Sequence, residues 1–570
     1  MMRPCWRGIA LRFLAVLALA AGGVSAPALA QRTAVTTAEG LYPRIVRISN
    51  NATPASNGRL VASVTAFPGG APEAQIYASD DDGASFRMLS RINDPLFARG
   101  LCCGGLYELP EAVGGLAKGT LLWAGSVGLD TPGEPMQLRI YRSTNRGESW
   151  SYLSNCATAT VNRGTQDGLW EPEFTIAADG SLVCFYADET DPRYSQKIMR
   201  VTSTDGINWT TPAPVLTSGV TADRPGMPVV TKLPSGRYFM TFEICGPAAC
   251  TAFYKTSADG LNWGDPGNMG ARIESEDGRW FLHTPTNTWG AVPGTPNGRI
   301  FVTGQILSSA GGIAAGNGRT VFYNDSADGS GKWKVLPAPV TINSPPTATN
   351  VCQNYSSPLL VSADGRVLMG LASDRETVGT ATVCRTFFGK TSTSPPAVSI
   401  GGSNLSLSAG QTASSTINLT PAAGFTGTVR LTVSIPGFPG TATLDRDTVS
   451  FAGGGAQTVG LTLRAQQTAS VGSGTGGLAS LGNFGFGMLA MLGLSPLVLL
   501  ASGLRKAAGV FGAVALLALG GCGGGGGNSG NPGTVVTPPL PSTYTATIVA
   551  TDVASSLNRT ETQFQVTLYR

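Results

Sequence analysis

A short turn phrase recurs six times along this 570-residue chain and constrains its fold more than any other feature. In each copy a glycine follows a turn residue and separates two apolar runs, a pattern typical of a β-hairpin turn. β units repeated at this period are typical of propeller blades. The sequence therefore predicts an all-β fold with a six-bladed propeller over residues 36–395. The six glycines, spaced 61, 61, 56, 62 and 67 residues apart, are Gly58, Gly119, Gly180, Gly236, Gly298 and Gly365.

The composition agrees with this fold and excludes several classes of protein. Charged residues make up 13% of the chain and aromatic residues 8%, which argues against a coiled coil, a nucleic-acid binder or a charged disordered protein. Three charges of the formal +4 belong to Arg3, Arg7 and Arg12, so no strongly charged partner is indicated. His283 is the single histidine, which leaves little basis for a His-ligated metal or a His-based triad. We predict no cofactor, no metal and no nucleic-acid partner.

The N-terminus is typical of a secretory signal. Residues 1–30 hold a basic region, an apolar stretch over 13–23 and a small-residue cleavage site, Ala28-Leu29-Ala30. We therefore expect an exported protein, whether extracellular, periplasmic or at the cell surface.

Eight of the ten cysteines lie between residues 102 and 384. An even number of cysteines in an exported region indicates disulfides. Cys245–Cys250 is the most plausible local bridge and Cys352–Cys384 the next. There is no C-x-x-C pair, so a zinc site is not expected.

The C-terminal third changes character. Residues 396–468 and 543–570 alternate as half-buried strands and predict the two parts of one Ig-like β-sandwich. Between them lie an apolar segment, 478–521, and a Gly/Pro/Ser linker, 522–542. Both parts of one sandwich must lie on the same side of a membrane. The apolar segment is therefore predicted as a membrane hairpin that turns at Arg505-Lys506 on the cytoplasmic side. The alternative is a buried or disordered apolar segment.

Strand direction predicts where functional side chains gather. Residues about 9–14 before each turn glycine and 7–9 after it fall on one common face, the mouth of the propeller. Ionisable groups that converge on such a mouth indicate a site. At these positions stand Arg44, Glu108, Glu171, Asp223, Arg224 and Tyr355 before the glycines, and Asp188, Glu189, Glu243 and Asp374 after them.

Several motifs carry a resemblance to known families over residues 38–395. The phrase from Ser79 to Phe86 and its weaker copies resemble the Asp-box, whose side chains bond their own turn. Tyr42-Pro43-Arg44-Ile45 and Asn354-Tyr355-Ser356-Ser357 resemble strands of the sialidase superfamily. Trp170-Glu171-Pro172-Glu173-Phe174 and Asp223-Arg224-Pro225-Gly226-Met227-Pro228 look closer to the exo-arabinanase-like family 93 glycoside hydrolases.

This resemblance implies a secreted, retaining glycoside hydrolase that removes terminal sugars from a plant-type polysaccharide, most like an exo-α-1,5-L-arabinanase. It implies that Glu171 is the acid/base, that Glu243 is the nucleophile and that Tyr355 lies beside Glu243. The residues expected to bind substrate are Arg44, Asp223, Arg224, Trp170, Glu108 and Asp188.

Two alternatives stay open. In an exo-sialidase Tyr355 would attack, Glu243 would take its proton, and Arg44 would bind the substrate carboxylate together with Arg224 and a third arginine, Arg319 or Arg385. The other alternative is a non-catalytic propeller that binds carbohydrate or protein, because fold alone proves no function.

Overall fold

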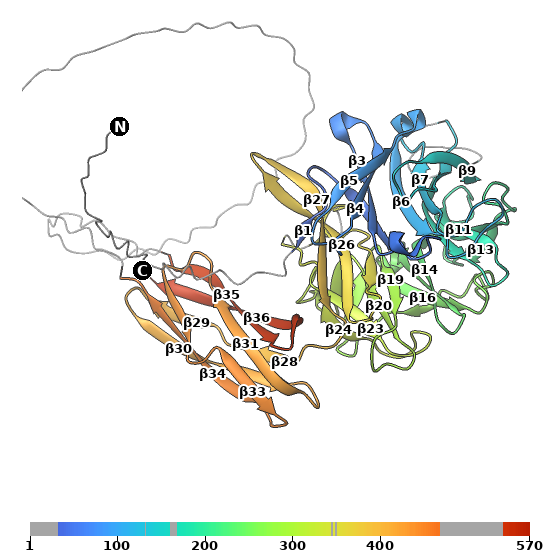
Figure 1. Cartoon of the computed structure of the whole chain (residues 1–570). Coiled ribbons are helices and arrows are strands. Elements are labelled where there is room, and N and C mark those ends of the chain that lie inside the picture. The colour runs from blue at the N-terminus through green and yellow to red at the C-terminus, as the bar shows by residue number, and fades with distance from the viewer. Residues whose placement is uncertain are drawn as a thin grey trace, which may run out of the picture.

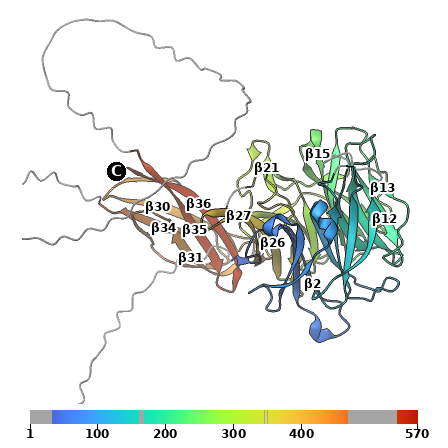
Figure 2. The ribbon, with the colours of Figure 1, turned by 90° about the horizontal axis from the view of Figure 1, so that it is seen from above.

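The computed structural model describes residues 32–131, 133–159, 168–343, 346–347, 350–467 and 540–569. The predicted signal (1–30), the predicted membrane hairpin (478–521) and most of the 522–542 linker lie outside these residues. No helix within the described ranges is long and apolar enough to cross a membrane. Figure 1 and Figure 2 show a propeller with a β-sandwich beside it, next to the blade that contains β26 and β27.

The first three blades are regular four-stranded antiparallel sheets. Blade 1 contains β2 (Leu41–Arg47), β3 (Leu60–Ala66), β4 (Glu73–Ser79) and β5 (Arg87–Ile92). Blade 2 contains β6 (Leu101–Glu108), β7 (Leu121–Val127), β8 (Gln137–Ser143) and β9 (Ser151–Thr158). Blade 3 contains β10 (Leu169–Ile176), β11 (Leu182–Asp188), β12 (Lys197–Ser203) and β13 (Ala213–Leu216).

The other three blades are less regular. Blade 4 contains β14 (Arg224–Lys232), β15 (Tyr238–Cys245) and β16 (Thr251–Ser257), extended by β17 (Ala271–Arg272), β18 (Trp280–Leu282), β21 (Ile306–Ser309) and β22 (Gly312–Ile313). Blade 5 contains β19 (Thr286–Gly290), β20 (Arg299–Thr303), β23 (Thr320–Asn324) and β24 (Lys334–Pro337). Blade 6 contains β25 (Leu359–Val361), β26 (Val367–Val378), β27 (Ala381–Ser392) and β1 (Thr33–Ala34). Four short 3-10 helices lie in connections: η1 (Pro54–Ser56), η2 (Pro68–Gly70), η3 (Pro95–Arg99) and η4 (Gly246–Ala248).

The six turn glycines behave as predicted. Each lies between the first two strands of a blade and has a positive φ, from 68° at Gly298 to 104° at Gly58. A residue with a side chain rarely adopts this conformation, so glycine marks these turns in the sequence. The Asp-box likewise stabilises a turn. Ser79 Oγ accepts from the backbone N–H of Gly83, and Asp81 Oδ1 accepts from that of Ser85 at 2.9 Å.

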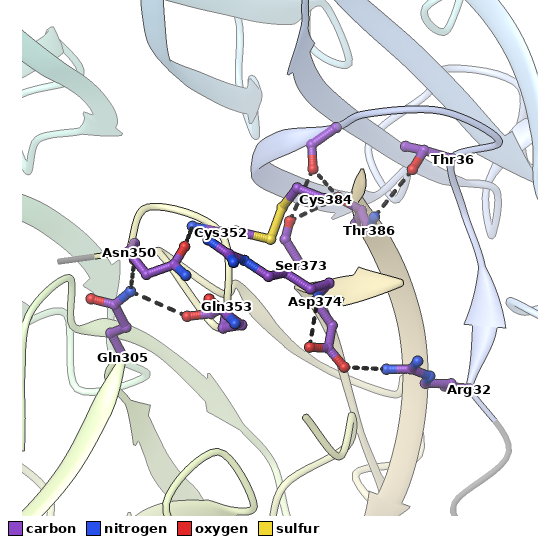
Figure 3. Close-up of a disulfide and its surroundings, with 12 residues drawn as sticks. Arg32, Thr36, Gln305, Asn350, Cys352, Gln353, Ser373, Asp374, Cys384 and Thr386 are labelled. Carbon is purple, nitrogen blue, oxygen red and sulfur yellow. Dashed lines mark hydrogen bonds and ion pairs between the residues drawn. A yellow bond between two sulfur atoms is a disulfide. The ribbon is translucent and has the colours of Figure 1, made fainter. Parts of the chain in front are cut away.

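The ring closes by joining the first described strand to the last blade. β1 pairs antiparallel with β27, Thr33 opposite Phe388. Figure 3 shows a further link at this closure, the Arg32–Asp374 ion pair at 2.6 Å, and beside it the predicted Cys352–Cys384 disulfide, which joins β27 to the segment before β25. Asp374 has no solvent exposure, and it also accepts from the backbone N–H of Asn343. Asp374 therefore closes the ring and is not available as a free carboxylate.

The C-terminal module is a two-sheet sandwich with its own apolar core. One sheet has the order β28 (Val398–Gly401), β30 (Thr412–Pro421), β34 (Gln457–Ala465), β32 (Gly440–Leu444). The other has the order β29 (Leu405–Ser408), β36 (Ser555–Tyr569), β35 (Ser542–Asp552), β31 (Thr426–Ser434), β33 (Thr448–Ala452). Strands from both sides of the apolar segment thus share one sheet. That this sandwich is Ig-like stays a prediction.

Candidate active site

Four blades carry the same irregularity in their first strand. In β2, β6, β10 and β14 two residues stand opposite one residue of the neighbouring strand, which is a β-bulge. The first bulge residue has a positive φ in every case: 51° at Tyr42, 61° at Cys103, 58° at Glu171 and 56° at Met227. Non-glycine residues rarely adopt this conformation, and where they do the surroundings must hold them there. The bulges meet at the mouth: Tyr42 Oη lies 3.7 Å from Met227 Sδ, and the Met227 N–H donates to Glu171 Oε2 at 2.8 Å.

Glu171 is held as a proton donor. Its side chain is partly exposed at the mouth, yet protein surrounds the carboxyl on most sides. Burial raises the pKa of Glu171 to about 8, and the negative charges of Glu243 and Glu189 add to the increase. The Met227 N–H and the Arg224 guanidinium act in the opposite direction. Near neutral pH this carboxyl therefore keeps its proton.

Glu243 ionises at lower pH than Glu171. It lies on β15, is 9% exposed, and its Oε2 accepts from the backbone N–H of Thr284 at 2.5 Å. Burial raises the pKa of Glu243 to about 7, while the Thr284 N–H and Arg224 favour the charged form. The environment thus separates the pKa values of two carboxyl groups at one mouth: Glu243 ionises first, and Glu171 keeps its proton to higher pH.

Tyr355 lies beside both carboxyl groups. Its pKa is raised well above 10 by burial and by the negative charges of Glu243 and Glu171. Its ring faces Tyr42, with the ring centroids 6.3 Å apart and the planes tilted by 55°. Tyr355 is therefore near enough to Glu243 to sense its charge, and it remains a neutral phenol.

Arg224, Glu189 and Trp170 form one hydrogen-bonded unit at the edge of the mouth. The Arg224 guanidinium pairs with Glu189 Oε1 and donates to Gln196 Oε1 at 2.8 Å. Glu189 Oε2 accepts from the indole N–H of Trp170 at 2.8 Å and from the backbone N–H of Gly168 at 3.1 Å. Glu189 is only 4% exposed, so its carboxylate faces the side chains that it holds and not the solvent. The indole ring of Trp170 is fixed one residue before Glu171.

Arg44 is buried at the mouth. It donates to the backbone oxygen and hydroxyl of Ser356 at 3.1 and 2.9 Å, and its guanidinium lies 4.3 Å from the centre of the Tyr42 ring. Glu173, which was not among the predicted residues, is partly exposed nearby. Burial raises the pKa of Glu173 to about 7, and the charge of Arg44 opposes this increase. The sequence could have indicated Glu173, because it stands two positions after Glu171 on the same strand.

The predicted position of Glu108 is wrong. It was expected at the mouth as a substrate-binding residue, but it ends β6, whereas the bulge that faces the mouth is near the start of that strand. Its carboxylate accepts from the backbone N–H groups of Ser49 and Asn50, from the Ser49 hydroxyl and from the Asn50 amide, at 2.8–3.2 Å. Glu108 therefore fastens the connection that follows β2 at the opposite end of the blades.

Asp188 and Asp223 lie at the mouth end of their blades but are used by their own loops. Asp188 Oδ1 accepts from the N–H and hydroxyl of Thr190 at 2.8 and 2.7 Å, and Oδ2 lies 3.4 Å from Lys197 Nζ. Asp223 Oδ2 accepts from the Ser218 hydroxyl at 2.5 Å. Within the described part of the chain neither aspartate forms a hydrogen bond or ion pair with Glu171 or Glu243, and their role in substrate binding stays a prediction.

One group of side chains near Glu243 has metal-ligand types. Possible ligand atoms of Glu243, Cys245, Cys250 and His283 all lie within 4.8 Å of one another. Cys245 and Cys250 form a disulfide, as predicted, so they offer no thiolate to a metal. In the disulfide form this group leaves one carboxylate and one imidazole, which is too few for a closed zinc site.

Comparisons with known proteins agree with the resemblance seen in the sequence. No family model and no curated protein matches the chain. Among solved structures, an α-L-arabinanase from Penicillium chrysogenum in complex with arabinobiose is similar, with 27% identity and a TM-score of 0.51 over 63% of this chain and 97% of that one. The predicted resemblance is confirmed.

Two further structures are similar to the propeller at lower scores. A GH93 α-L-arabinofuranosidase from Fusarium graminearum, also with arabinobiose, has 24% identity and a TM-score of 0.49 over 63% of this chain and 96% of that one. The NanB sialidase from Streptococcus pneumoniae has 11% identity and a TM-score of 0.40 over 64% of this chain and 70% of that one.

Proposed function

We propose that the propeller is an exo-acting, retaining glycoside hydrolase that releases arabinofuranosyl units from arabinan-type polysaccharides. The observation that carries the proposal is the pair of carboxyl groups at one mouth, Glu171 and Glu243, with pKa values raised to about 8 and about 7. Glycoside cleavage needs one carboxyl group that is protonated and one that is ionised. The similarity to the Penicillium arabinanase supports the substrate class.

The two glutamates would act in turn. Glu243 attacks the anomeric carbon and forms a covalent glycosyl ester, while Glu171 gives its proton to the leaving glycosidic oxygen. In the second step water attacks the anomeric carbon of the glycosyl ester and releases the Glu243 carboxylate, while Glu171, now ionised, takes a proton from that water. Each carboxyl group thereby returns to its starting state, and after two displacements the released sugar keeps its anomeric configuration.

The surrounding residues would position the sugar. Tyr355, as a neutral phenol beside Glu243, can donate a hydrogen bond to the ring oxygen or to the attacking carboxylate. Trp170, whose indole N–H is fixed by Glu189, offers an aromatic face at the edge of the mouth. Arg44 is oriented by Ser356 and lies close enough to Glu173 to influence its ionisation.

In the sialidase alternative, both candidates for the third arginine are engaged elsewhere. Arg319 pairs with Glu561 of the sandwich, and Arg385 binds the backbone oxygen of Thr36 and pairs with Glu376. The raised pKa of Tyr355 also disfavours the phenol as a nucleophile. A non-catalytic binding propeller gives no reason for two carboxyl groups to be placed where ionisation is penalised.

We also infer that the enzyme works outside the cytosol. The described residues contain four disulfides, which are typical of exported proteins: Cys102–Cys103, Cys156–Cys184, Cys245–Cys250 and Cys352–Cys384. Anchoring to a membrane through residues 478–521 stays a prediction.

The deciding experiment is hydrolysis by the mature chain. Linear arabinan, an aryl α-L-arabinofuranoside and an aryl sialoside would be tested in parallel, with Glu171→Gln and Glu243→Gln as inactive variants. Glu111→Gln is the matched control, because Glu111 is exposed and lies outside the mouth. We expect arabinose release that both site variants abolish and the control retains, with ¹H NMR detecting a first product of retained configuration. Release from the sialoside alone would overturn the proposal.

A further inference from the structure

The bulge of blade 2 carries a disulfide between adjacent residues, Cys102 and Cys103. Neither cysteine has a part in the mechanism proposed above, and both side chains are partly exposed. In this they differ from Cys156 and Cys184, which are joined in a disulfide with at most 3% exposure. A disulfide at a solvent-accessible mouth calls for an explanation other than core packing.

Strand register places this disulfide in the mouth. Cys102 pairs with Ser126 and Gly105 with Ala124, so Cys103 is the first bulge residue of β6. The same register position holds Tyr42 in blade 1 and Glu171 in blade 3, both of which face the mouth. Because blade 2 lies between these blades, Cys103 stands in the ring between an aromatic residue and the acid.

Close packing between blades 2 and 3 supports this placement. A Cβ built on Gly105 would lie 2.3 Å from the carbonyl oxygen of Pro172, so the two strands meet at backbone distance. Pro172 directly follows Glu171, and Gly105 stands two residues after Cys103. In the register of the blades, Cys102 is also the counterpart of Trp170, the aromatic residue at the edge of the mouth.

The chemistry of a disulfide differs from that of its neighbours in the mouth. Two bonded sulfur atoms are polarisable and weakly hydrogen-bonding, and the eight-membered ring that they close with the backbone is rigid. Such a surface can pack against the C–H groups on one face of a sugar ring, whereas polar side chains pack poorly against them. We propose that the Cys102–Cys103 disulfide is an apolar binding surface against which the sugar held by Glu171 packs. This rests on the proposed glycosidase function.

The test compares ligand binding by variants of the mature chain, with arabinobiose as the probe. Cys102→Ala/Cys103→Ala removes the surface, and Cys156→Ala/Cys184→Ala is the matched control that removes a buried disulfide. Loss of an apolar contact of about 50 Å² corresponds to roughly tenfold in affinity. We therefore expect Kd and KM to rise about tenfold in the first variant with kcat within threefold, and Kd to be unchanged in the control. An unchanged Kd in the first variant would overturn the inference.

A second measurement needs no variant. A sugar seated on the disulfide should shield it, so saturating arabinobiose should slow its reduction by a phosphine at least fivefold, as followed by alkylation and mass spectrometry. Equal rates with and without ligand would overturn the inference. If the wild-type chain hydrolyses arabinan but these results are negative, only the inference fails. If the wild-type chain neither binds arabinobiose nor hydrolyses arabinan, the proposed function fails and the inference with it.

Discussion

Replacing Glu243 by glutamine should stabilise the protein at alkaline pH and leave it almost unchanged in acid. Burial raises the pKa of this carboxyl from 4.5 to about 7, so the unfolded chain loses the proton first as pH rises. The stability that the protonated group contributes is fully present below pH 4.5 and is lost as pH rises through 7. At 1.36 kcal/mol for each pKa unit, ionisation in the folded state costs about 3 kcal/mol well above pH 7.

Glutamine keeps the shape and the acceptor of this side chain but cannot ionise. Its oxygen can still accept from the Thr284 N–H, so little should change where the native carboxyl is protonated. Removing the charge also lowers the pKa of Glu171, which Glu243 helps to raise. Both effects act in the same direction at high pH, and the expected gain is about 2–3 kcal/mol at pH 8.5.

Urea unfolding of the mature chain at pH 5 and pH 8.5 measures this gain. At pH 5 the gain should fall to about 1 kcal/mol or less, because there only the unfolded chain has begun to lose this proton. Glu111→Gln should match the wild type at both pH values, because Glu111 is exposed. A gain of the same size at both pH values would refute the reasoning, since burial of a charge would then not be its cause. A variant that is less stable at pH 8.5 would also refute it.

Three further outcomes follow from the site and from the closed ring. With arabinan, the plot of kcat/KM against pH should be bell-shaped, with an acidic limb near pH 7, where Glu243 loses its proton, and an alkaline limb near pH 8, where Glu171 loses its proton. With a dinitrophenyl arabinoside, whose leaving group needs no acid, the alkaline limb should disappear. An alkaline limb that persists with this substrate would exclude Glu171 as the acid. Glu189→Ala removes the ion-pair partner of Arg224 and should lower kcat/KM about 10- to 100-fold, as steady-state kinetics would measure, whereas unaltered kinetics would remove this unit from substrate positioning. Arg32→Ala leaves a buried carboxylate unpaired at the ring closure and should destabilise the chain by about 3 kcal/mol, visible as a lower midpoint in urea; a midpoint equal to that of the wild type would mean that closure does not depend on this pair.

The propeller could be predicted because its signal is local and repeated. Gly298 and the other five turn glycines mark the hairpins directly, since a positive φ at these positions selects glycine. The Cys245–Cys250 and Cys352–Cys384 disulfides could also be proposed, because the two cysteines of each pair are near each other in the sequence. Irregular strand pairing in blade 4 carries no such mark, because it depends on contacts between residues far apart in the sequence.

Counting from the glycines is most direct where the hairpin connection is short. In blade 1, whose connection spans 48–59, only the far end of the counting window, Arg44, lies at the mouth. Residues 177–181 and 233–237 join the first two strands of blades 3 and 4, and there the count reached Glu171 and Arg224 correctly. In blade 2 the connection spans 109–120, so the same count stopped at Glu108, at the far end of the strand. The length of a surface loop, which the fold tolerates easily, thus moved the prediction from one face to the other.

The bulges explain why the pKa values of the carboxyl groups at the mouth could not be predicted from the sequence. Tyr42, Cys103, Glu171 and Met227 hold positive φ values without being glycine, at a cost of roughly 1–2 kcal/mol each. No local pattern announces such a residue, because only the neighbouring blades can hold it in place. The bulge at Glu171 places its carboxyl against the Met227 N–H and near the charge of Glu243, and from this placement comes the high pKa that makes it an acid. The sequence names the carboxylates, but the closed ring of blades decides which of them keeps its proton.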